Sequence, residues 1–249
     1  MLYLIFSDVH GNLEALSRLL QIASKLKPDA FVSLGDLVGY GPNPNEVVNR
    51  VRKLSKVSAI RGNHDKVAAE LEDDRFFNPV AAKAIRWTSK KLSEENLKYL
   101  KNLVRGPLMI RDDFTIFHGS FLDEDAYIFG PYEALLSLQT SPTRLSFFGH
   151  THFPVLFRLT PAKRLEMMTP RTAKNRVLFP LDPESTYLIN PGSVGQPRDR
   201  DPRLSFMTYD SHQRLVTYYR YRYQAEKTQA KIQLHKLPPF LGERLLKGV

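Results

Sequence analysis

Side chains that can bind a metal ion recur in this sequence directly after short apolar runs. Five such runs are followed within a few residues by aspartate, asparagine or histidine: Asp8 and His10, Asp36, Asn63 and His64, His118, and His150 and His152. Carboxylate, amide and imidazole donors together suit divalent Mn, Fe, Zn, Co or Ni, and there is too much imidazole for a calcium site. The chain has no cysteine, which excludes thiolate ligands and disulfides.

Each of these residues, taken alone, also has a structural interpretation. A single histidine is more often a hydrogen-bonded structural residue than a ligand, and Asp8 or Asp36 could cap a helix or form an Asx turn. Asp65, beside His64, could cap a helix that starts near Lys66 or could orient His64. The pattern as a whole favours a metal site, because the residues recur at the ends of five predicted strands.

The apolar runs that precede these residues have the texture of alternating strands and helices. Residues 2–6 and 30–34 read as buried strands, each followed by a helical pattern, and 57–60 closes a third unit of the same kind. Three such units in succession predict a parallel sheet with crossover helices. The carboxyl ends of its strands would face one crevice, which is where α/β sheets bind ligands.

The sequence changes in character after this first part. Residues 66–104 have helical texture, whereas after Gly106 short β-rich runs predominate, among them "FTIF", "RVLF", "LSFMTYD" and "RLVTYYRYRY". These runs predict a second, mostly antiparallel sheet. The tail from residue 225 predicts a helix broken at Pro238–Pro239 and a short final helix.

Composition indicates a globular chain. It has 249 residues, of which 42% are hydrophobic and 25% charged, without low-complexity segments. The N-terminal apolar run is too short for a secretory signal or a membrane span, so we expect a cytoplasmic protein. No linker is evident, and we expect a single domain over 1–249, with the candidate metal ligands in 8–152 and a β-rich part with tail helices in 153–249.

The net charge of +10 lies almost entirely in the last third of the chain. Residues 1–157 hold 19 basic and 18 acidic side chains, whereas 158–249 hold 17 basic and 8 acidic ones. Such a surface could attract phosphate esters or nucleic acid, or could simply be solvated. The basic stretch 158–176 predicts an exposed hairpin that could guide anions or contact a second subunit, and the loop 190–203 could cradle an anion or form a turn.

The order of the polar blocks resembles a known family. The blocks are "DVH" at 8–10, "GD" at 35–36, "GNHD" at 62–65, "HG" at 118–119 and "GHTH" at 149–152. They resemble the five blocks of the calcineurin-like metallophosphoesterase superfamily. "INPGSVGQPRDRDPR" and "LPPFLGERLLKG" resemble its small bacterial and archaeal phosphodiesterases, the diadenosine-tetraphosphatase-like branch. The resemblance implies an α/β fold, a four-layer αββα sandwich with two mixed β-sheets face to face between helices.

The same resemblance implies roles for the residues. Two divalent ions, manganese first and otherwise iron, zinc, nickel or cobalt, would have two ligand sets: Asp8, His10 and His152, and Asn63, His118 and His150. Asp36 would bridge both ions through its two carboxylate oxygens. A hydroxide between the ions would attack phosphorus in line, and His64 would stabilise phosphoryl charge and protonate the leaving alkoxide.

The second block departs from the Ser/Thr protein phosphatase branch. That branch reads Gly-Asp-x-x-Asp-Arg-Gly, whereas this chain reads "GDLVGYG", with Gly39 and Tyr40 in place of the later Asp and Arg. The cation that grips phosphate would then come from elsewhere, and the candidates are Arg61, Arg198 and Arg203. Aromatic residues that could stack on a base, or serve core packing, are Tyr40, Phe121, Tyr127 and Tyr132.

The leading hypothesis is a binuclear-metal phosphoesterase acting on phosphodiesters or phosphomonoesters. Its substrate would be a small phosphate ester or a nucleotide, with no membrane partner. The alternatives are a nuclease, a protein phosphatase and a catalytically inert metal-binding scaffold. Nucleic acid is a less favoured partner, and homo-oligomer formation stays open.

Overall fold

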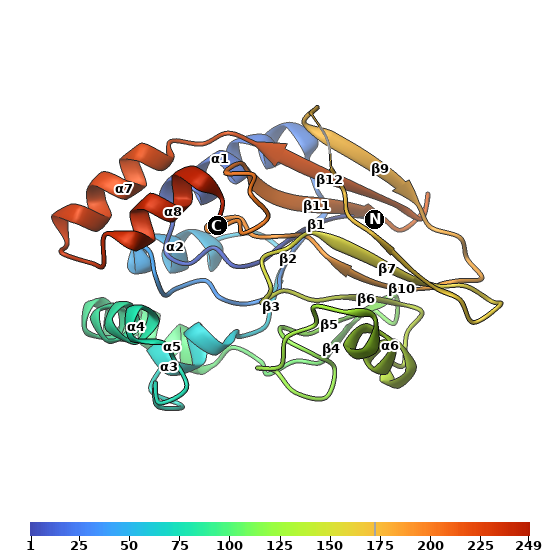
Figure 1. The fold of residues 1–249 in the computed structure, drawn as a ribbon, viewed down its shortest axis with the longest axis horizontal. Coiled ribbons are helices and arrows are strands. Elements are labelled where there is room, and N and C mark those ends of the chain that lie inside the picture. The colour runs from blue at the N-terminus through green and yellow to red at the C-terminus, as the bar shows by residue number, and fades with distance from the viewer. Residues whose placement is uncertain (172) are drawn as a thin grey trace.

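The three parallel strands predicted near the N-terminus form half of a six-stranded sheet. The computed structural model describes residues 1–171 and 173–249, and Figure 1 shows the arrangement of its layers. The strand order of this first sheet is β3 (Val57–Ala59), β2 (Ala30–Ser33), β1 (Leu2–Phe6), β11 (Leu204–Asp210), β12 (Leu215–Tyr221) and β9 (Arg176–Pro180). β1 pairs in parallel with β2, and β2 with β3, whereas the other pairs are antiparallel.

The sequence-based assignment of β9, β11 and β12 to the second sheet is wrong, because they extend the first one. β11 lies antiparallel along β1, with Leu2 opposite Asp210 and Ile5 opposite Met207. Without β11, the edge of β1 away from β2 would carry unpaired backbone N–H and C=O groups. The late strands therefore complete the sheet that the first βα units begin.

The second sheet is built from the middle of the chain. Its order is β4 (Leu108–Ile110), β5 (Phe114–Ile116), β6 (Leu145–Phe147), β10 (Thr186–Asn190), β7 (Val155–Leu159) and β8 (Leu165–Met168). β6 is parallel to both of its neighbours, and the remaining pairs are antiparallel. Both sheets are mixed, as the sequence resemblance implies.

The described helices are α1 (Leu13–Leu26), α2 (Pro44–Val51), α3 (Asn63–Ala68), α4 (Pro79–Lys91), α5 (Glu94–Lys101), α6 (Pro131–Thr140), α7 (Ala225–Leu234) and α8 (Phe240–Lys247). α1 packs on the first sheet and α6 on the second, whereas α3, α4, α5, α7 and α8 contact mainly other helices. The break between α7 and α8 contains Pro238–Pro239, as predicted, because proline cannot continue a helix. None of the described helices is long and apolar enough to cross a lipid bilayer.

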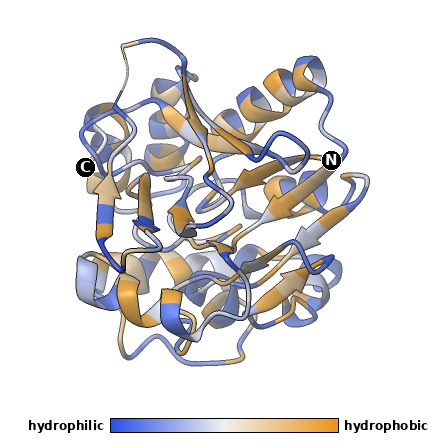
Figure 2. Cartoon of the chain, turned by 90° about the vertical axis from the view of Figure 1, so that its right-hand side faces the viewer, coloured by the Kyte–Doolittle hydropathy of each residue, from blue (hydrophilic) through white to orange (hydrophobic). Residues whose placement is uncertain are grey.

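Alternation along the strands divides the core into layers. On β1, Tyr3 and Ile5 face the second sheet and pack in one cluster with Phe114 and Phe147, whereas Leu4 faces outward and packs in a cluster with the α1 and α2 side chains. On the far side of the second sheet, α6 packs in a third cluster. Figure 2 shows apolar colouring on the central strands. The order helix, sheet, sheet, helix confirms the predicted four-layer sandwich.

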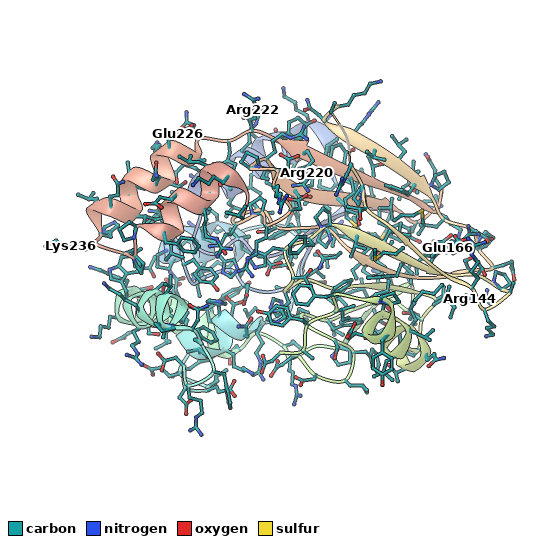
Figure 3. All side chains as sticks on the ribbon, viewed as in Figure 1. Arg144, Glu166, Arg220, Arg222, Glu226 and Lys236 are labelled. Carbon is teal, nitrogen blue, oxygen red and sulfur yellow. The ribbon has the colours of Figure 1, made fainter. Side chains whose placement is uncertain are left out.

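The basic stretch 158–176 begins in the hairpin of β7 and β8, and its residue 172 lies outside the described residues. The Arg158 guanidinium contacts Asp182 at 2.7 Å and Glu166 at 3.6 Å. Figure 3 shows Glu166 at one end of the molecule, opposite the end at which Lys236 lies. Neighbouring carboxylates therefore neutralise part of this charge.

Candidate metal centre

Most of the predicted ligands lie in tight turns beyond the ends of strands. Asp8 and His10 follow β1, Asp36 follows β2, and His150 and His152 follow β6. All five have φ angles between 48° and 64° and are buried. Residues other than glycine rarely adopt this left-handed backbone, which costs about 1–3 kcal/mol and is concentrated at functional sites. These turns direct carboxylate and imidazole groups into one buried crevice.

Asp8, His10 and His152 form the first group of potential ligands. The His10 and His152 rings donate from Nδ1 to the backbone oxygens of Val38 (3.1 Å) and Gln196 (2.6 Å), because a carbonyl oxygen can only accept. Their Nε2 atoms therefore carry lone pairs and face each other at 3.1 Å, with Asp8 Oδ1 3.4 Å from that of His152. Such an arrangement is repulsive without a cation, and neither Asp8 oxygen has a hydrogen-bond partner among the described residues. The donor set fits a divalent metal ion.

Asp36, Asn63, His118 and His150 form the second group. His118 Nε2 lies 3.4 Å from Asp36 Oδ2 and 3.2 Å from Asn63 Oδ1, and its Nδ1 donates to a backbone oxygen at 2.7 Å. His150 Nε2 donates to the backbone oxygen of Asp125 at 3.0 Å, so Nδ1 is the nitrogen left for a metal. This second set also fits a divalent ion, with nitrogen and oxygen donors together.

Asp36 lies between the two groups. Its Oδ2 is 3.6 Å from His10 Nε2 and 3.4 Å from His118 Nε2. Its Oδ1 instead accepts a hydrogen bond from the backbone N–H of His64 at 2.9 Å. Asp36 would thus hold a cation between the two groups while the first turn of α3 fixes the orientation of its carboxylate.

Burial governs the protonation of the site. It raises the pKa of Asp8 to about 7, and it lowers the pKa of His150 to about 3 and that of His10 well below its ordinary value. Burial also opposes the Asp36 charge, but His118, His64 and His10 together outweigh it and lower the pKa of Asp36. Burial likewise opposes a charge on His118, but the neighbouring carboxylates, Asp36 foremost, raise the pKa of His118. The site thus favours a positive charge beside Asp36, which a divalent cation can supply, and neutral imidazoles are the form that binds metals.

His64 is buried among aromatic rings, beside Asp36. Its ring centre lies 4.4 Å from that of Tyr40, 4.6 Å from that of Phe77 and 4.8 Å from that of His10. Burial lowers the pKa of His64 to about 4, and its Nδ1 has no hydrogen-bond partner among the described residues. Gly39 lies directly against Nδ1, so that no side chain fits between them. Nε2 is the ring nitrogen left for a substrate.

Asp65 caps α3, which begins at Asn63 rather than near Lys66. One carboxylate oxygen accepts from the N–H of Gly62 at 3.2 Å, and the other accepts from the N–H of Val38 at 3.1 Å. The first turn of α3 therefore carries both Asn63 and His64. Of the two interpretations of Asp65, these bonds support the helix cap, which also holds the loop after β2.

The loop 190–203 packs against the ligand turns. Ser193 Oγ donates to the backbone oxygen of Asp8 at 2.9 Å, and the N–H of Gly195 donates to the same oxygen at 2.9 Å. Gln196 supplies the carbonyl that orients His152. The loop thus buttresses the first ligand group. Side-chain patterns in the sequence give no signal for Gln196, because its contribution is a backbone oxygen.

The three candidate arginines have different surroundings. Arg61 forms a two-point ion pair with Glu124 at 2.9 and 3.1 Å, and Arg203 pairs with Asp201 at 2.6 Å. Arg198 donates to a Gln196 amide oxygen at 2.9 Å, and its guanidinium carbon lies 5.9 Å from the Tyr40 ring centre. After burial, Arg198 is the largest influence that lowers the pKa of His152. Arg198 therefore lies beside the ligand groups, whereas Arg61 and Arg203 each form an ion pair with a carboxylate.

Two of the four candidate aromatic residues lie beside the ligands. Tyr40 contacts the His10 and His64 rings, and Tyr127 stacks on His150 with ring centres 3.8 Å apart. Phe121 packs against Phe117 in the core instead, and the Tyr132 side chain is exposed on α6.

Comparison with known proteins agrees with this geometry. The sequence profile of the calcineurin-like phosphoesterase superfamily domain matches residues 1–214. The Methanocaldococcus jannaschii protein MJ0912 is 35% identical over 98% of this chain and 97% of its own. The phosphodiesterase YfcE of Escherichia coli is 28% identical over 62% of this chain and 72% of its own.

Comparison with solved structures identifies further similar proteins. A metallophosphoesterase from Sphaerobacter thermophilus is 38% identical, with a TM-score of 0.87 and full coverage of both chains. The Pyrococcus horikoshii protein PH1004 shares the fold at 20% identity, with a TM-score of 0.81 over 100% of this chain and 98% of its own. The metal-ligand blocks, the sandwich and these relatives agree, and the chain belongs to the calcineurin-like phosphoesterase superfamily.

Proposed function

We propose that this chain hydrolyses phosphodiester or phosphomonoester bonds with two divalent cations. The observation that carries the proposal is the overlap of three potential ligand groups. The groups are Asp8, His10 and His152; His10, Asp36 and His64; and Asp36, His118 and His150. Because His10 and Asp36 each belong to two groups, the potential ligand positions adjoin, as a two-metal site requires.

The first ion would be held by Asp8, His10 and His152, the second by Asn63, His118 and His150, with Asp36 between them. Bound there, divalent cations such as Mn²⁺ would lower the pKa of a water molecule and neutralise charge on phosphoryl oxygens. Asn63 is neutral, so the second set has a smaller negative charge and leaves more positive charge for a phosphate anion.

His64 and Arg198 would act on the substrate directly. A neutral imidazole with its proton at Nε2 can donate a hydrogen bond to the leaving oxygen, and the low pKa of His64 agrees with that neutral form. The Arg198 guanidinium would bind a non-bridging phosphoryl oxygen. The second Asp and the Arg of the protein phosphatase block are missing at Gly39 and Tyr40, which favours small phosphoesters over phosphoproteins.

The test is metal dependence combined with a histidine substitution. Protein stripped with a chelator should lose hydrolysis of bis(p-nitrophenyl) phosphate and p-nitrophenyl phosphate, and Mn²⁺ should restore it. His64→Ala should lower kcat by about 10²–10⁴-fold while bound metal stays unchanged. His212→Ala, in an exposed turn, is the matched control. Activity that survives chelation, or a fully active His64→Ala protein, would refute the proposal.

The alternatives receive less support from the site. The basic surplus of the last third is partly paired, since Arg203 contacts Asp201, Arg220 contacts Asp199 and Lys231 contacts Glu14. Because these basic side chains are paired with carboxylates, they give the nuclease hypothesis no additional support. An inert scaffold would have no need for a buried His64 beside the ligands. The single domain over 1–249, the cytoplasmic location and homo-oligomer formation stay predictions from the sequence.

A further inference from the structure

A pocket of about 300 Å³ opens directly from the second ligand group, and no role has yet been given to it. His64, Asn63 and His150 line its inner end, and Phe76, Phe77 and Tyr127 line its walls. Its volume lies at the lower end of the range for small-molecule sites. Because His64 would serve the leaving oxygen, a group that occupies this pocket is the leaving alcohol of the phosphoester.

The aromatic side chains of the pocket present few open ring faces, and these do not surround a central point. Tyr127 is covered on both faces, by His150 at 3.8 Å and by Phe129 at 5.0 Å, so it presents its edge and hydroxyl group. One side of the Phe77 ring packs on His64 at 4.6 Å. Phe76 at the rim is 83% exposed, which leaves its ring open to a ligand. A flat ring fits such walls better than a compact ammonium group, which needs several open ring faces around it.

The charges that line the pocket are negative. Glu72, Asp73 and Asp125 belong to its lining, and no lysine or arginine does so within the described part of the chain. Ion pairs with Lys66 and Arg75 hold these carboxylates but leave oxygen lone pairs for further donors. The lining therefore disfavours a second phosphate group and favours N–H donors, such as the exocyclic amine of a nucleobase.

We propose that this pocket binds a nucleoside whose base carries an exocyclic amino group, as the leaving alcohol of the substrate. The base stacks on Phe76 and Phe77, and its amine donates to a carboxylate of the rim. The inference rests on the proposed function, since it names the substrate class of the same site. Adenosine and cytidine satisfy both requirements. Uridine satisfies the stacking, but its one base donor, N3–H, is flanked by two carbonyl oxygens that would face the rim carboxylates.

The experiment measures binding of free nucleosides to the Mn²⁺-loaded protein by calorimetry, and their inhibition of bis(p-nitrophenyl) phosphate hydrolysis. Adenosine should bind and compete with the substrate. Uridine should bind about tenfold more weakly or worse, because it has a carbonyl oxygen, which a carboxylate repels, where the other bases have the amine. Phe76→Ala should weaken adenosine about tenfold without loss of folding, since that ring is exposed. Tyr132→Ala, an exposed aromatic residue of α6, should change nothing. Asp73→Asn should reduce the difference between adenosine and uridine.

The outcomes separate this inference from the proposed function. Hydrolysis of bis(p-nitrophenyl) phosphate together with no nucleoside binding would overturn the pocket assignment and leave the phosphoesterase intact. Adenosine binding that depends on Phe76, in a protein that hydrolyses no ester, would support the pocket and refute the enzyme. Binding of choline in preference to adenosine, or equal loss of binding in Phe76→Ala and Tyr132→Ala, would overturn the assignment.

Discussion

Lys66 joins the helix that carries Asn63 to the loop whose backbone orients His150. Its Nζ lies 2.5 Å from Asp125 Oδ2, 2.6 Å from Glu72 Oε2 and 3.5 Å from Glu124 Oε1. Lys66 stands on the same short helix as Asn63, and the backbone oxygen of Asp125 orients His150. We predict that Lys66→Met weakens one of two metal-binding events, because it releases Asp125 and with it the orientation of His150.

The expected size of the effect follows from what the substitution leaves behind. Asp125 and Glu72 are 42% and 37% exposed, so water can solvate them once the ammonium group is gone. Glu124 is 9% exposed but keeps Arg61 at 2.9 Å. The loss of stability should therefore be about 1.5–3 kcal/mol, below the ~3–5 kcal/mol that follows when a buried charge is left unpaired. Loss of an outer partner of a metal ligand should lower affinity about 10–100-fold at that site.

The assay is calorimetric titration of the metal-free protein with Mn²⁺, alongside thermal unfolding. Wild type should show two binding events, Lys66→Met should show one of them weakened, and Lys66→Arg should recover most of it. Lys227→Met, an exposed lysine of α7, controls for the loss of one positive charge. Equal weakening of both events, or unchanged binding in a destabilised protein, would limit Lys66 to a structural role and refute the reasoning.

Three further predictions test other parts of the site. Gly39→Ala should lower stability by about 1–3 kcal/mol and abolish turnover, because Gly39 has a φ of 101° and lies against His64; wild-type kinetics in the variant would contradict this. Arg198→Ala should raise KM for bis(p-nitrophenyl) phosphate about tenfold or more, whereas Arg203→Ala, whose guanidinium pairs with Asp201, should leave it unchanged; equal effects would refute the distinction. Mn²⁺ at about 1,000 times its Kd should raise the free energy of unfolding by about 4 kcal/mol, and a chelator that failed to reverse the gain would exclude binding at these ligands.

The fold was predictable where its signals are local. Asn12 caps α1 through a hydrogen bond from the N–H of Ala15, and Pro28 follows the end of that helix, so both boundaries are visible in the sequence. The pairing of β11 with β1 was not predictable in this way. It joins Leu2 to Asp210 across most of the chain, and a β-rich run does not record which strand edge it will cover.

The candidate site, too, was predictable from the sequence only in part. The donor types after each strand predicted which side chains would meet, and the structure brings them together. The sequence offered Arg61, Arg198 and Arg203 as equivalent candidates. Only folding distinguishes their surroundings, because Arg61 pairs with Glu124, which is remote in sequence, while Arg198 lies over Tyr40.

The orientation of the imidazoles depends on atoms that carry no sequence signal. Backbone oxygens of Val38, Leu34, Gln196 and Asp125 accept from His10, His118, His152 and His150, respectively. These acceptors come from separate loops, and each fixes which ring nitrogen is left for a metal. Which ring nitrogen each histidine offers is therefore a property of the packed loops rather than of the histidine motifs. A substitution that shifts one of these loops should impair metal binding even when every ligand is retained.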